Sequence, residues 1–443
     1  MGLRDAGAWS IRIDRSGNWE STFISSLCNS ENGLKSVGLV WLSSWLNVLY
    51  TMIFDSSGKI SLHTGTASDH INNLRRIPFI PLSDGTYSST DEGTIWLHSG
   101  TFSTGSGDDG PETFPVLYGK LRIVTPALLS ASKTIDISCL DMSVMDNVTR
   151  MLQRVGVQQL STHEIVKIHI LPALSHDRIE IGDKKLMVEY LSFVMFHLQS
   201  SCPDCHLERG HIISELNNKA FILTNYGYKR PAEVSIHFSK EFGNPIDANK
   251  LVNEMDWKWH ELDVAYLKHP ITGLLPGGMM KRREFFQEIG ISDFVHVISV
   301  EKSITQISDV ALKNILWGGD MIFPGVFAKD WESPELVHLL SQLYSIRDQN
   351  RCKYLLEVLD TLWDDCFSDK VTGQCTSSST GDVLTFKSSV ISNLCNTPWL
   401  ISSMDHELHY SRDLFYDCDA VRSILGTAAP YAVPKVSLMN LIT

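Results

Sequence analysis

A weak internal repeat is the feature of this sequence that most constrains its fold. The repeat is recognised by short motifs, which we call anchors. The first anchor is an apolar run that ends in a turn and is followed downstream by an acidic residue. Three copies lie at residues 77–85, 219–227 and, in a poorer form, 397–403. Each copy predicts a short strand, a tight turn and a second strand, because the Asp-Gly and Tyr-Gly pairs at the turns permit positive φ.

Two further anchors follow in the same order along the chain. Residues 121–129 align with residues 259–267, and residues 151–157 align with residues 285–291, where an apolar helix end meets a glycine that can cap it. Residues 421–426 are a candidate third copy of that helix end. Conserved order at similar gaps favours a true repeat, although hairpins and capped helices also recur independently in α+β proteins.

The repeat predicts an α+β chain of two to three units, each with a helix, a β-hairpin and further helices around one core. A chain of 443 residues is long enough for several such cores. We expect an N-terminal extension at residues 1–33, repeat unit 1 at 34–175, repeat unit 2 at 176–333 and a partial repeat unit 3 at 334–443. Strongly apolar helices are expected before the hairpins, at residues 37–54, 186–198 and 354–363.

The charge balance argues against a nucleic-acid partner. The chain has 38 Lys and Arg against 51 Asp and Glu, a formal net charge of -13. Proteins that bind nucleic acid usually present a basic face, because contacts with phosphate supply most of their non-specific affinity. The strongest basic run is Lys281-Arg282-Arg283, and Glu284 follows it at once.

No membrane span or export signal is expected. The first ten residues lack a basic segment followed by an apolar run. Residues 37–54 have nearly the length of a span, but Ser43, Ser44 and Asn47 interrupt them, which favours a buried helix. Nine mostly scattered cysteines then fit a reducing compartment with free thiols.

The motifs for catalysis and cofactor binding are incomplete. Residues 105–110 match GxGxxG, but Pro111 follows directly and two aspartates inside the motif would repel phosphate, so a surface loop is favoured. His163 and His169 do not have HExxH spacing, and no nucleophile elbow or P-loop is present. We therefore predict no catalytic residues and no cofactor, and we expect a non-enzymatic protein.

One cluster of soft ligands could bind zinc. Its candidate ligands are Cys202, Cys205, His206 and His211. Structural zinc usually needs a second, separated ligand pair, and the sequence has no second CxxC or HxxxH. We therefore predict no metal here and expect a turn after a helix that ends near Leu198, with a zinc-binding interaction module as the alternative.

Three strings resemble the NO VEIN family of large plant proteins: residues 77–98 (IPFIPLSDGTYSSTDEGTIWLH), 219–231 (KAFILTNYGYKRP) and 429–436 (APYAVPKV). The resemblance covers nearly the whole chain, and the hairpin repeat also resembles the repeating regions of sacsin, a large chaperone-like protein. It implies a nuclear protein, with the cytoplasm as the alternative site, that acts in auxin-dependent patterning of veins, embryo and root and in cell-fate decisions. It also implies a histidine-kinase-like (GHKL) ATPase region before the matched part and a nuclease-like region near the C-terminus of the family.

The chain departs from the family at the ATPase. A GHKL site needs an Asn-bearing helix and a DxGxG loop, and the nearest approach, residues 5–8, lacks the second glycine. We therefore expect a central piece of a longer regulator that acts as a non-catalytic scaffold or chaperone-like segment and binds protein partners. The alternatives are a zinc-binding module, as above, or a part of an ATP-dependent enzyme whose catalytic region lies outside this chain.

Overall fold

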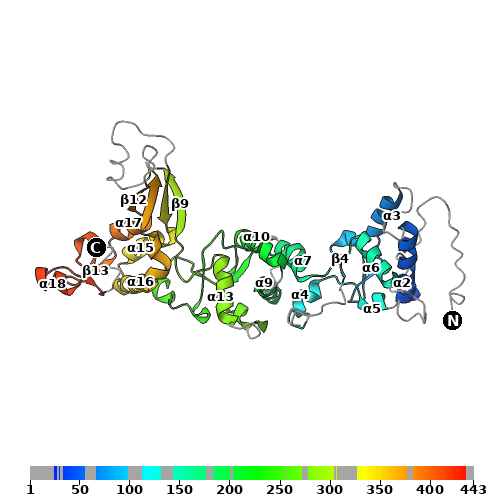
Figure 1. Ribbon diagram of the computed structural model, residues 1–443. Helices are drawn as coiled ribbons and strands as arrows, with labels where there is room; N and C mark the ends of the chain where they lie inside the picture. The colour runs from blue at the N-terminus through cyan, green and yellow to red at the C-terminus, as the bar shows by residue number, and fades with distance from the viewer. Residues whose placement is uncertain are drawn as a thin grey trace. The chain divides into compact units, whose positions relative to one another are not determined.

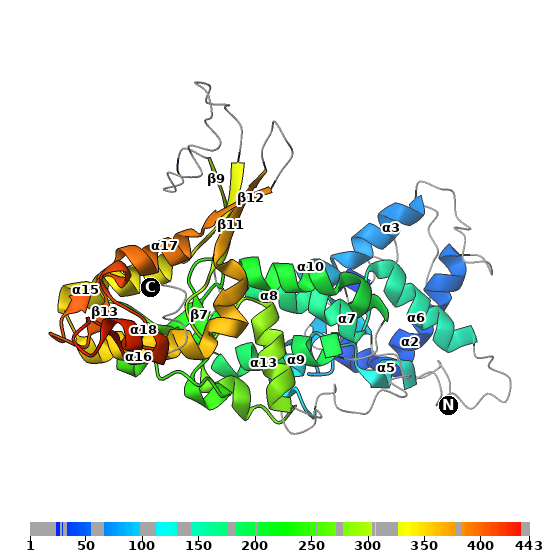
Figure 2. The same cartoon turned by 60° about the vertical axis from the view of Figure 1, so that its left-hand side comes forward.

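The chain forms two compact units that each combine helices with small sheets (Figures 1 and 2). A computed structural model describes residues 24–26, 29, 33–54, 66–97, 112–130, 143–175, 183–199, 203–253, 255–271, 278–303, 306, 327–376 and 383–435. Unit 1 comprises Met1–Arg209 and His269–Leu274, and unit 2 comprises Gly210–Lys268 and Leu275–Thr443. The mixture of helix and strand confirms the predicted α+β class, whereas the predicted division at residues 33, 175 and 333 stays a prediction.

Unit 1 is mainly helical. Its helices are α2 (Gly33–Ile53), α3 (Thr66–Arg75), α4 (Pro115–Lys120), α5 (Pro126–Ser130), α6 (Ser143–Val155), α7 (Thr162–Glu164), a π-helical segment (Ile165–Ile170), α8 (Leu171–Ser175), α9 (Lys184–Gln199) and the start of α10 (Pro203–Lys219). Its strands are β1 (Ile80–Pro81), β2 (Tyr87–Ser88), β3 (Trp96–Leu97) and β4 (Gln158–Gln159), with a 3₁₀ turn at Thr90–Glu92.

The apolar segment at residues 37–54 forms most of α2 and contributes to the core of unit 1. Leu42, Leu46 and Leu49 are buried there, but Val40 and Val48 on the same helix are about half exposed. The expected buried helix is therefore confirmed on the face that packs into the core, and the opposite face of α2 is partly exposed. Among the described residues, no helix is long and apolar enough to cross a membrane.

Unit 2 contains most of the strands. Its first elements are β5 (Ile222–Thr224), β6 (Gly227–Lys229), β7 (Ile236–His237), a 3₁₀ turn (Lys240–Phe242), α11 (Asn249–Val252), β8 (His260–Glu261), a 3₁₀ turn (Val264–Lys268) and α13 (Gly278–Glu288). The next are β9 (Ile298–Ser303), β10 (Phe327–Glu332), α15 (Pro334–Ile346), α16 (Gln349–Leu362), a π-helical segment (Trp363–Phe367), a 3₁₀ turn (Ser368–Lys370), β11 (Thr372–Thr376) and β12 (Val383–Lys387). The last are α17 (Ser389–Asn396), β13 (Leu400–Ser402), β14 (Leu408–His409), a 3₁₀ turn (Ser411–Asp413), α18 (Asp419–Leu425) and β15 (Ala432–Val433).

A four-stranded antiparallel sheet in the order β12-β11-β10-β9 is the largest sheet among the described residues, and its strands run side by side in both views (Figures 1 and 2). The Gly, Ser and Thr content of residues 368–382 predicts a flexible loop. That expectation was wrong for the described part of the segment, because β11 pairs with β10 on one side and β12 on the other. Its Gly and Ser content indicated a loop, but cross-strand hydrogen bonds outweigh that local preference.

Three hairpins lie where the first anchor predicts them. β1 pairs with β2, β5 with β6, and β13 with β14, all antiparallel. In each case a later segment of the chain lies beside the hairpin, and one of its carbonyl oxygens accepts a hydrogen bond from the hairpin backbone. Ser83 N–H donates to Ile123 O at 2.8 Å, Asn225 N–H to Glu261 O at 3.0 Å, and Ser403 N–H to Tyr431 O at 2.8 Å. The reading of these segments as sacsin-like repeat units stays a prediction.

The candidate third copy of the helix end has a different place in the structure. α18 does end at Gly426, which has a φ of 75°. After α18, Tyr431 forms a parallel bridge with Phe415, which precedes the helix. In unit 1, Ile123 forms the equivalent parallel bridge with Trp96, and the helix between these two residues is α4. By its pairing, α18 therefore corresponds to α4 and not to α6, so the alignment of residues 421–426 with residues 151–156 was wrong.

Helices α15, α16 and α17 bury the main core of unit 2. Leu339 and Leu355 are fully buried within it, and Trp399 packs there with no exposed surface. The indole Nε1–H of Trp399 donates to Leu394 O at 2.8 Å, so that its one polar group is satisfied. This core supports the start of α15, where the candidate site lies.

Candidate metal centre

The zinc candidates that the structure describes, Cys205, His206 and His211, lie on a helix and not in a turn. Cys202 lies outside the described residues, and Cys205 and His206 belong to the first turn of α10, with side chains outside the described set. His211 is exposed on the same helix. Because a helix turns about 100° per residue, His211 lies roughly 240° around α10 from Cys205. The expected turn was therefore wrong, and a zinc role for these residues stays untested.

The other motifs do not converge on one site. The GxGxxG at residues 105–110 lies outside the described residues. His163 Nδ1 lies 3.3 Å from His197 Nε2, whereas His169 Nε2 lies 3.0 Å from the hydroxyl of Tyr190. The two histidines of this segment thus have different partners.

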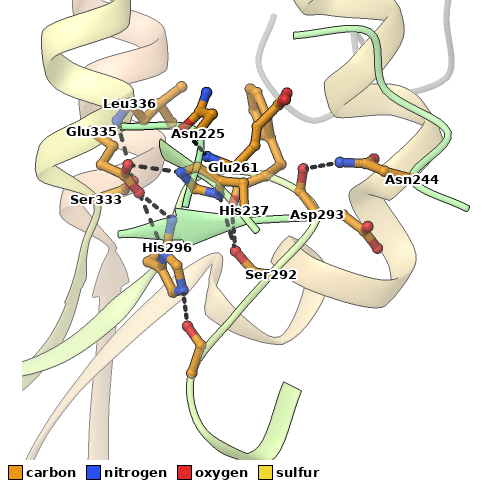
Figure 3. Close-up of polar contacts among 12 residues, drawn as sticks. Asn225, His237, Asn244, Glu261, Ser292, Asp293, His296, Ser333, Glu335 and Leu336 are labelled. Carbon is orange, nitrogen blue, oxygen red and sulfur yellow. Dashed lines mark hydrogen bonds and ion pairs between the residues drawn. The ribbon is translucent and has the colours of Figure 1, made fainter. Parts of the chain in front are cut away.

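A cluster that the sequence did not indicate is formed by His237, His296 and Glu335 (Figure 3). We call it the His-His-Glu cluster. Each residue offers one possible ligand atom, and these three atoms all lie within 4.8 Å of one another. All three residues belong to unit 2.

Local structure holds His237 in place. It lies in β7, which pairs in parallel with β8 and also bridges to Ser292. Its imidazole stacks on the indole of Trp259, with ring centroids 3.8 Å apart and planes 17° apart. The residue is only 1% exposed, so its ring has little freedom to turn.

Glu335 is positioned by the start of α15. Ser333 caps this helix by accepting a hydrogen bond from Leu336 N–H, and Pro334 occupies the first turn, as the sequence predicts. A carboxylate in the first turn is favoured by the partial positive charge of the helix N-terminus. The backbone N–H of His296 donates to Glu335 Oε2 at 2.8 Å and holds the carboxylate toward the two imidazoles.

The hydrogen bonds of the cluster determine which ring nitrogens carry protons. Glu335 Oε1 lies 3.1 Å from His237 Nε2, and Glu335 Oε2 lies 3.4 Å from His296 Nδ1. His296 Nε2 lies 2.8 Å from the carbonyl oxygen of Gly290, which can only accept, so this nitrogen is the donor. In a neutral His296 ring, Nδ1 would then direct a lone pair at a carboxylate. A proton on Nδ1 or a metal ion between the two groups would remove this repulsion.

Burial and hydrogen bonding move the pKa values of the three groups in different directions. Burial lowers the pKa of His237 despite its contact with Glu335. Burial also acts to lower the pKa of His296, but its contacts with Glu335 and Gly290 outweigh this and raise it. Burial would raise the pKa of Glu335, yet hydrogen bonds from both histidines hold it well below its ordinary range. Glu335 is therefore an anion and His237 a neutral imidazole at neutral pH.

A second buried polar cluster joins β9, β10 and α17. Lys302 Nζ lies 2.6 Å from Asp330 Oδ2 and 2.7 Å from Ser389 Oγ. Asp330 also accepts from the Ser389 backbone N–H at 2.9 Å, so it caps α17. Burial opposes the charge on Lys302, but its hydrogen bonds to Asp330 and Glu332 raise its pKa. A lysine held as a cation cannot take a proton from Ser389, so this is a structural cluster and not a Ser-Lys nucleophile.

The His-His-Glu cluster could not be found by motif. Glu335 is 98 positions from His237 and 39 from His296. The repeat provides no signal either, because the unit 1 residue that pairs as His237 does is Trp96, which pairs in parallel with Gln158 and bridges to Ile123. Only the pairing of β7 with the segment before β9, and the packing of α15, bring the three side chains together.

Comparison with known proteins finds one extensive similarity. Over 420 residues, or 95% of the chain, the sequence is 48% identical to Protein NO VEIN of Arabidopsis thaliana. The chain spans only 15% of the length of that protein. No family model matches the chain, and no solved structure matches it.

Proposed function

This chain is a NO VEIN-like protein, and from that relationship we propose that it acts as a non-catalytic central scaffold or chaperone-like segment of a plant developmental regulator. The observation that carries the proposal is the 48% identity over 420 residues. Because the match spans 15% of the relative, the activity proposed here is that of one segment in a longer protein. Any ATPase or nuclease-like chemistry of the longer protein is assigned to other segments.

The proposed process is auxin-dependent patterning of veins, embryo and root, together with cell-fate decisions. The proposed location is the nucleus. Both follow from the relationship to NO VEIN and from no feature of the fold itself.

A scaffold role is supported by one polar cluster of unit 2 whose hydrogen bonds serve structure and not catalysis. Ser389 and Lys302, which could have formed a nucleophile and its base, are both bound to Asp330. The two cores of the described residues consist of aliphatic and aromatic side chains that support surfaces for protein partners. Two other functions remain as alternatives: part of an ATP-dependent GHKL enzyme that is completed outside this chain, and a zinc-binding module that uses Cys202 and Cys205.

An exchange of segments tests the proposal. Arabidopsis NO VEIN from which the matching segment has been deleted is expected to fail in leaf-vein and root patterning, and insertion of this chain at that place is expected to restore both. The matched control is the same insertion with Trp399→Ala, which removes the centre of a buried core and is expected to destabilise it by about 3–5 kcal/mol. Failure of the folded wild-type insertion to restore patterning would contradict the proposal.

A biochemical experiment separates the scaffold role from the alternatives. The purified chain is expected to suppress aggregation of a heat-denatured client protein to the same extent with and without ATP. An effect that requires ATP would favour the enzyme alternative. Loss of the effect in a Cys202→Ser, Cys205→Ser variant would favour the zinc-binding module.

A further inference from the structure

We propose that His237, His296 and Glu335 bind a zinc ion, which fastens β7 and the segment before β9 to the start of α15. This site is separate from the cysteine-based zinc alternative and does not depend on the proposed scaffold role.

The spacing of the ligand atoms suits a tetrahedral ion. Zinc binds imidazole nitrogen and carboxylate oxygen at about 2.0–2.2 Å, so two ligand atoms on one tetrahedral ion lie about 3.3 Å apart. Glu335 Oε1 lies 3.1 Å from His237 Nε2, and Glu335 Oε2 lies 3.4 Å from His296 Nδ1. One ligand atom from each of the three residues lies within 4.8 Å of the other two, so closing the widest of these distances to about 3.3 Å would place all three groups around one ion.

The residues around the cluster orient the ligands as metal sites require. Metal-binding histidines usually donate their second ring N–H to a carbonyl or carboxylate oxygen, which directs the other nitrogen's lone pair at the metal. His296 does this through Nε2 and the carbonyl of Gly290 at 2.8 Å. His237 is held by its stack on Trp259, and its Nδ1 lies 3.5 Å from Ser292 Oγ. Glu335 is held by the backbone N–H of His296.

The chemistry of the ligands indicates which ion binds. Two imidazoles and one carboxylate suit zinc and also iron(II), whereas calcium and magnesium prefer a set of oxygen ligands. We choose zinc because three protein ligands and one water make the four-coordinate site typical of it. The His237 side chain is 1% exposed, but those of His296 and Glu335 are 28% and 18% exposed, so water can reach one side of the cluster. A water molecule there would complete four-coordination with three protein ligands.

The approach of His296 Nδ1 to the Glu335 carboxylate has two solutions. The neutral form of His296 directs its Nδ1 lone pair at the Glu335 carboxylate, and zinc between them would turn this repulsion into two bonds. A proton on His296 is the competing solution, and it would make the cluster an ordinary buried ion pair. The two solutions differ in whether the cluster takes up zinc.

Zinc binding by the full chain, prepared without a polyhistidine tag and dialysed against a chelator, tests the proposal. Isothermal titration with zinc chloride is expected to show one tight site per chain. Glu335→Gln and His296→Ala are each expected to weaken it by at least about tenfold, since even second-shell changes cost that much at metal sites. The matched control is His409→Ala, which removes an exposed histidine 3.0 Å from Asp405 and is expected to leave binding unchanged.

Cobalt(II) provides a second readout that reports geometry. Cobalt in a four-coordinate His-His-Glu site is expected to give an intense visible absorption that Glu335→Gln abolishes, while circular dichroism shows that the variant remains folded. The proposal is overturned if the wild-type chain takes up no zinc, or if Glu335→Gln binds zinc as tightly as the wild type. It is also overturned if Cys202→Ser, Cys205→Ser alone removes the site.

Discussion

At the scale of single residues, Arg282 and Arg283 show how differently neighbouring charges can be accommodated. Arg283 donates to Phe242 O at 3.0 Å and pairs with Asp293. Arg282 is 1% exposed, and its Nε and Nη2 have no hydrogen-bond partner in the described part of the chain. Burial lowers the pKa of Arg282 to about 10. In the sequence both residues belong to one basic run, which is usually exposed to solvent. Only the packing of α13 shows that Arg282 is buried without a partner among the described residues and that Arg283 is paired.

Arg282→Met is therefore expected to stabilise the protein. Replacing even a buried ion pair with apolar side chains of similar volume is often neutral or stabilising by about 1–4 kcal/mol, and an unpaired buried charge has no attraction to lose. We expect thermal unfolding of the variant to occur several degrees above that of the wild type.

Arg283→Met is the matched control at the adjacent position. It leaves the buried Asp293 without its partner and should lower the unfolding temperature. A fall in stability for Arg282→Met as well would show that Arg282 has a counter-charge and would refute the argument.

At the scale of elements, pairing across the four-stranded sheet explains one glycine. Gly373 in β11 lies directly opposite Phe386 in β12. A Cβ atom on Gly373 would lie 2.2 Å from Cζ of the Phe386 ring, which is itself buried. The Phe386 ring thus packs directly on the Cα of Gly373, so a side chain at position 373 would fit only if the residue at position 386 were smaller.

Gly373→Ala is expected to destabilise the sheet by about 1–3 kcal/mol, the usual cost of overpacking a filled core. Urea unfolding should show the loss, and adding Phe386→Leu should restore part of it. Gly210→Ala is the matched control, since Gly210 is exposed on α10 and has open space around its Cα. That change should raise stability by roughly 1 kcal/mol through helix propensity. Equal effects at both glycines would contradict the packing argument.

At the scale of the whole molecule, two buried carboxylates should make the chain sensitive to acid. Burial opposes the charge on both, but hydrogen bonds from His237 and His296 lower the pKa of Glu335, and those from Lys302 and Ser389 lower that of Asp330. A carboxyl group whose pKa is lower in the folded state stabilises that state fully above its unfolded pKa, here about 4.5 for Glu335 and 3.8 for Asp330. This contribution is lost as the pH falls from there toward the folded pKa.

Thermal unfolding between about pH 5 and about pH 3 measures this contribution. The wild type should lose stability steeply across that range. Glu335→Gln and Asp330→Asn should each be less stable at pH 7 but have a shallower slope in acid. Asp91→Asn, which breaks the exposed pair of Asp91 with Arg76, is the control and should change little at any pH. An unchanged acid slope in both buried variants would rule out these two groups as the cause.

The sequence by itself determined the features that depend on neighbouring residues. The turns at Gly85 and Gly227 have φ values of 82° and 85°, as hairpin turns with glycine require. Ser161 and Ser333 cap helices, as a serine just before the first helical turn favours. These features follow from backbone geometry and hydrogen bonds over a few residues, which the local sequence specifies.

Only the tertiary structure decided which distant side chains meet. The segment after Cys202 is a helix and not a turn, and β11 forms where composition favoured a loop, because pairing and packing outweigh weak local preferences. The His-His-Glu cluster forms because β7, the segment before β9 and the first turn of α15 are packed around one core. No local rule relates residues so far apart in the sequence, so their chemistry becomes visible only in the folded protein.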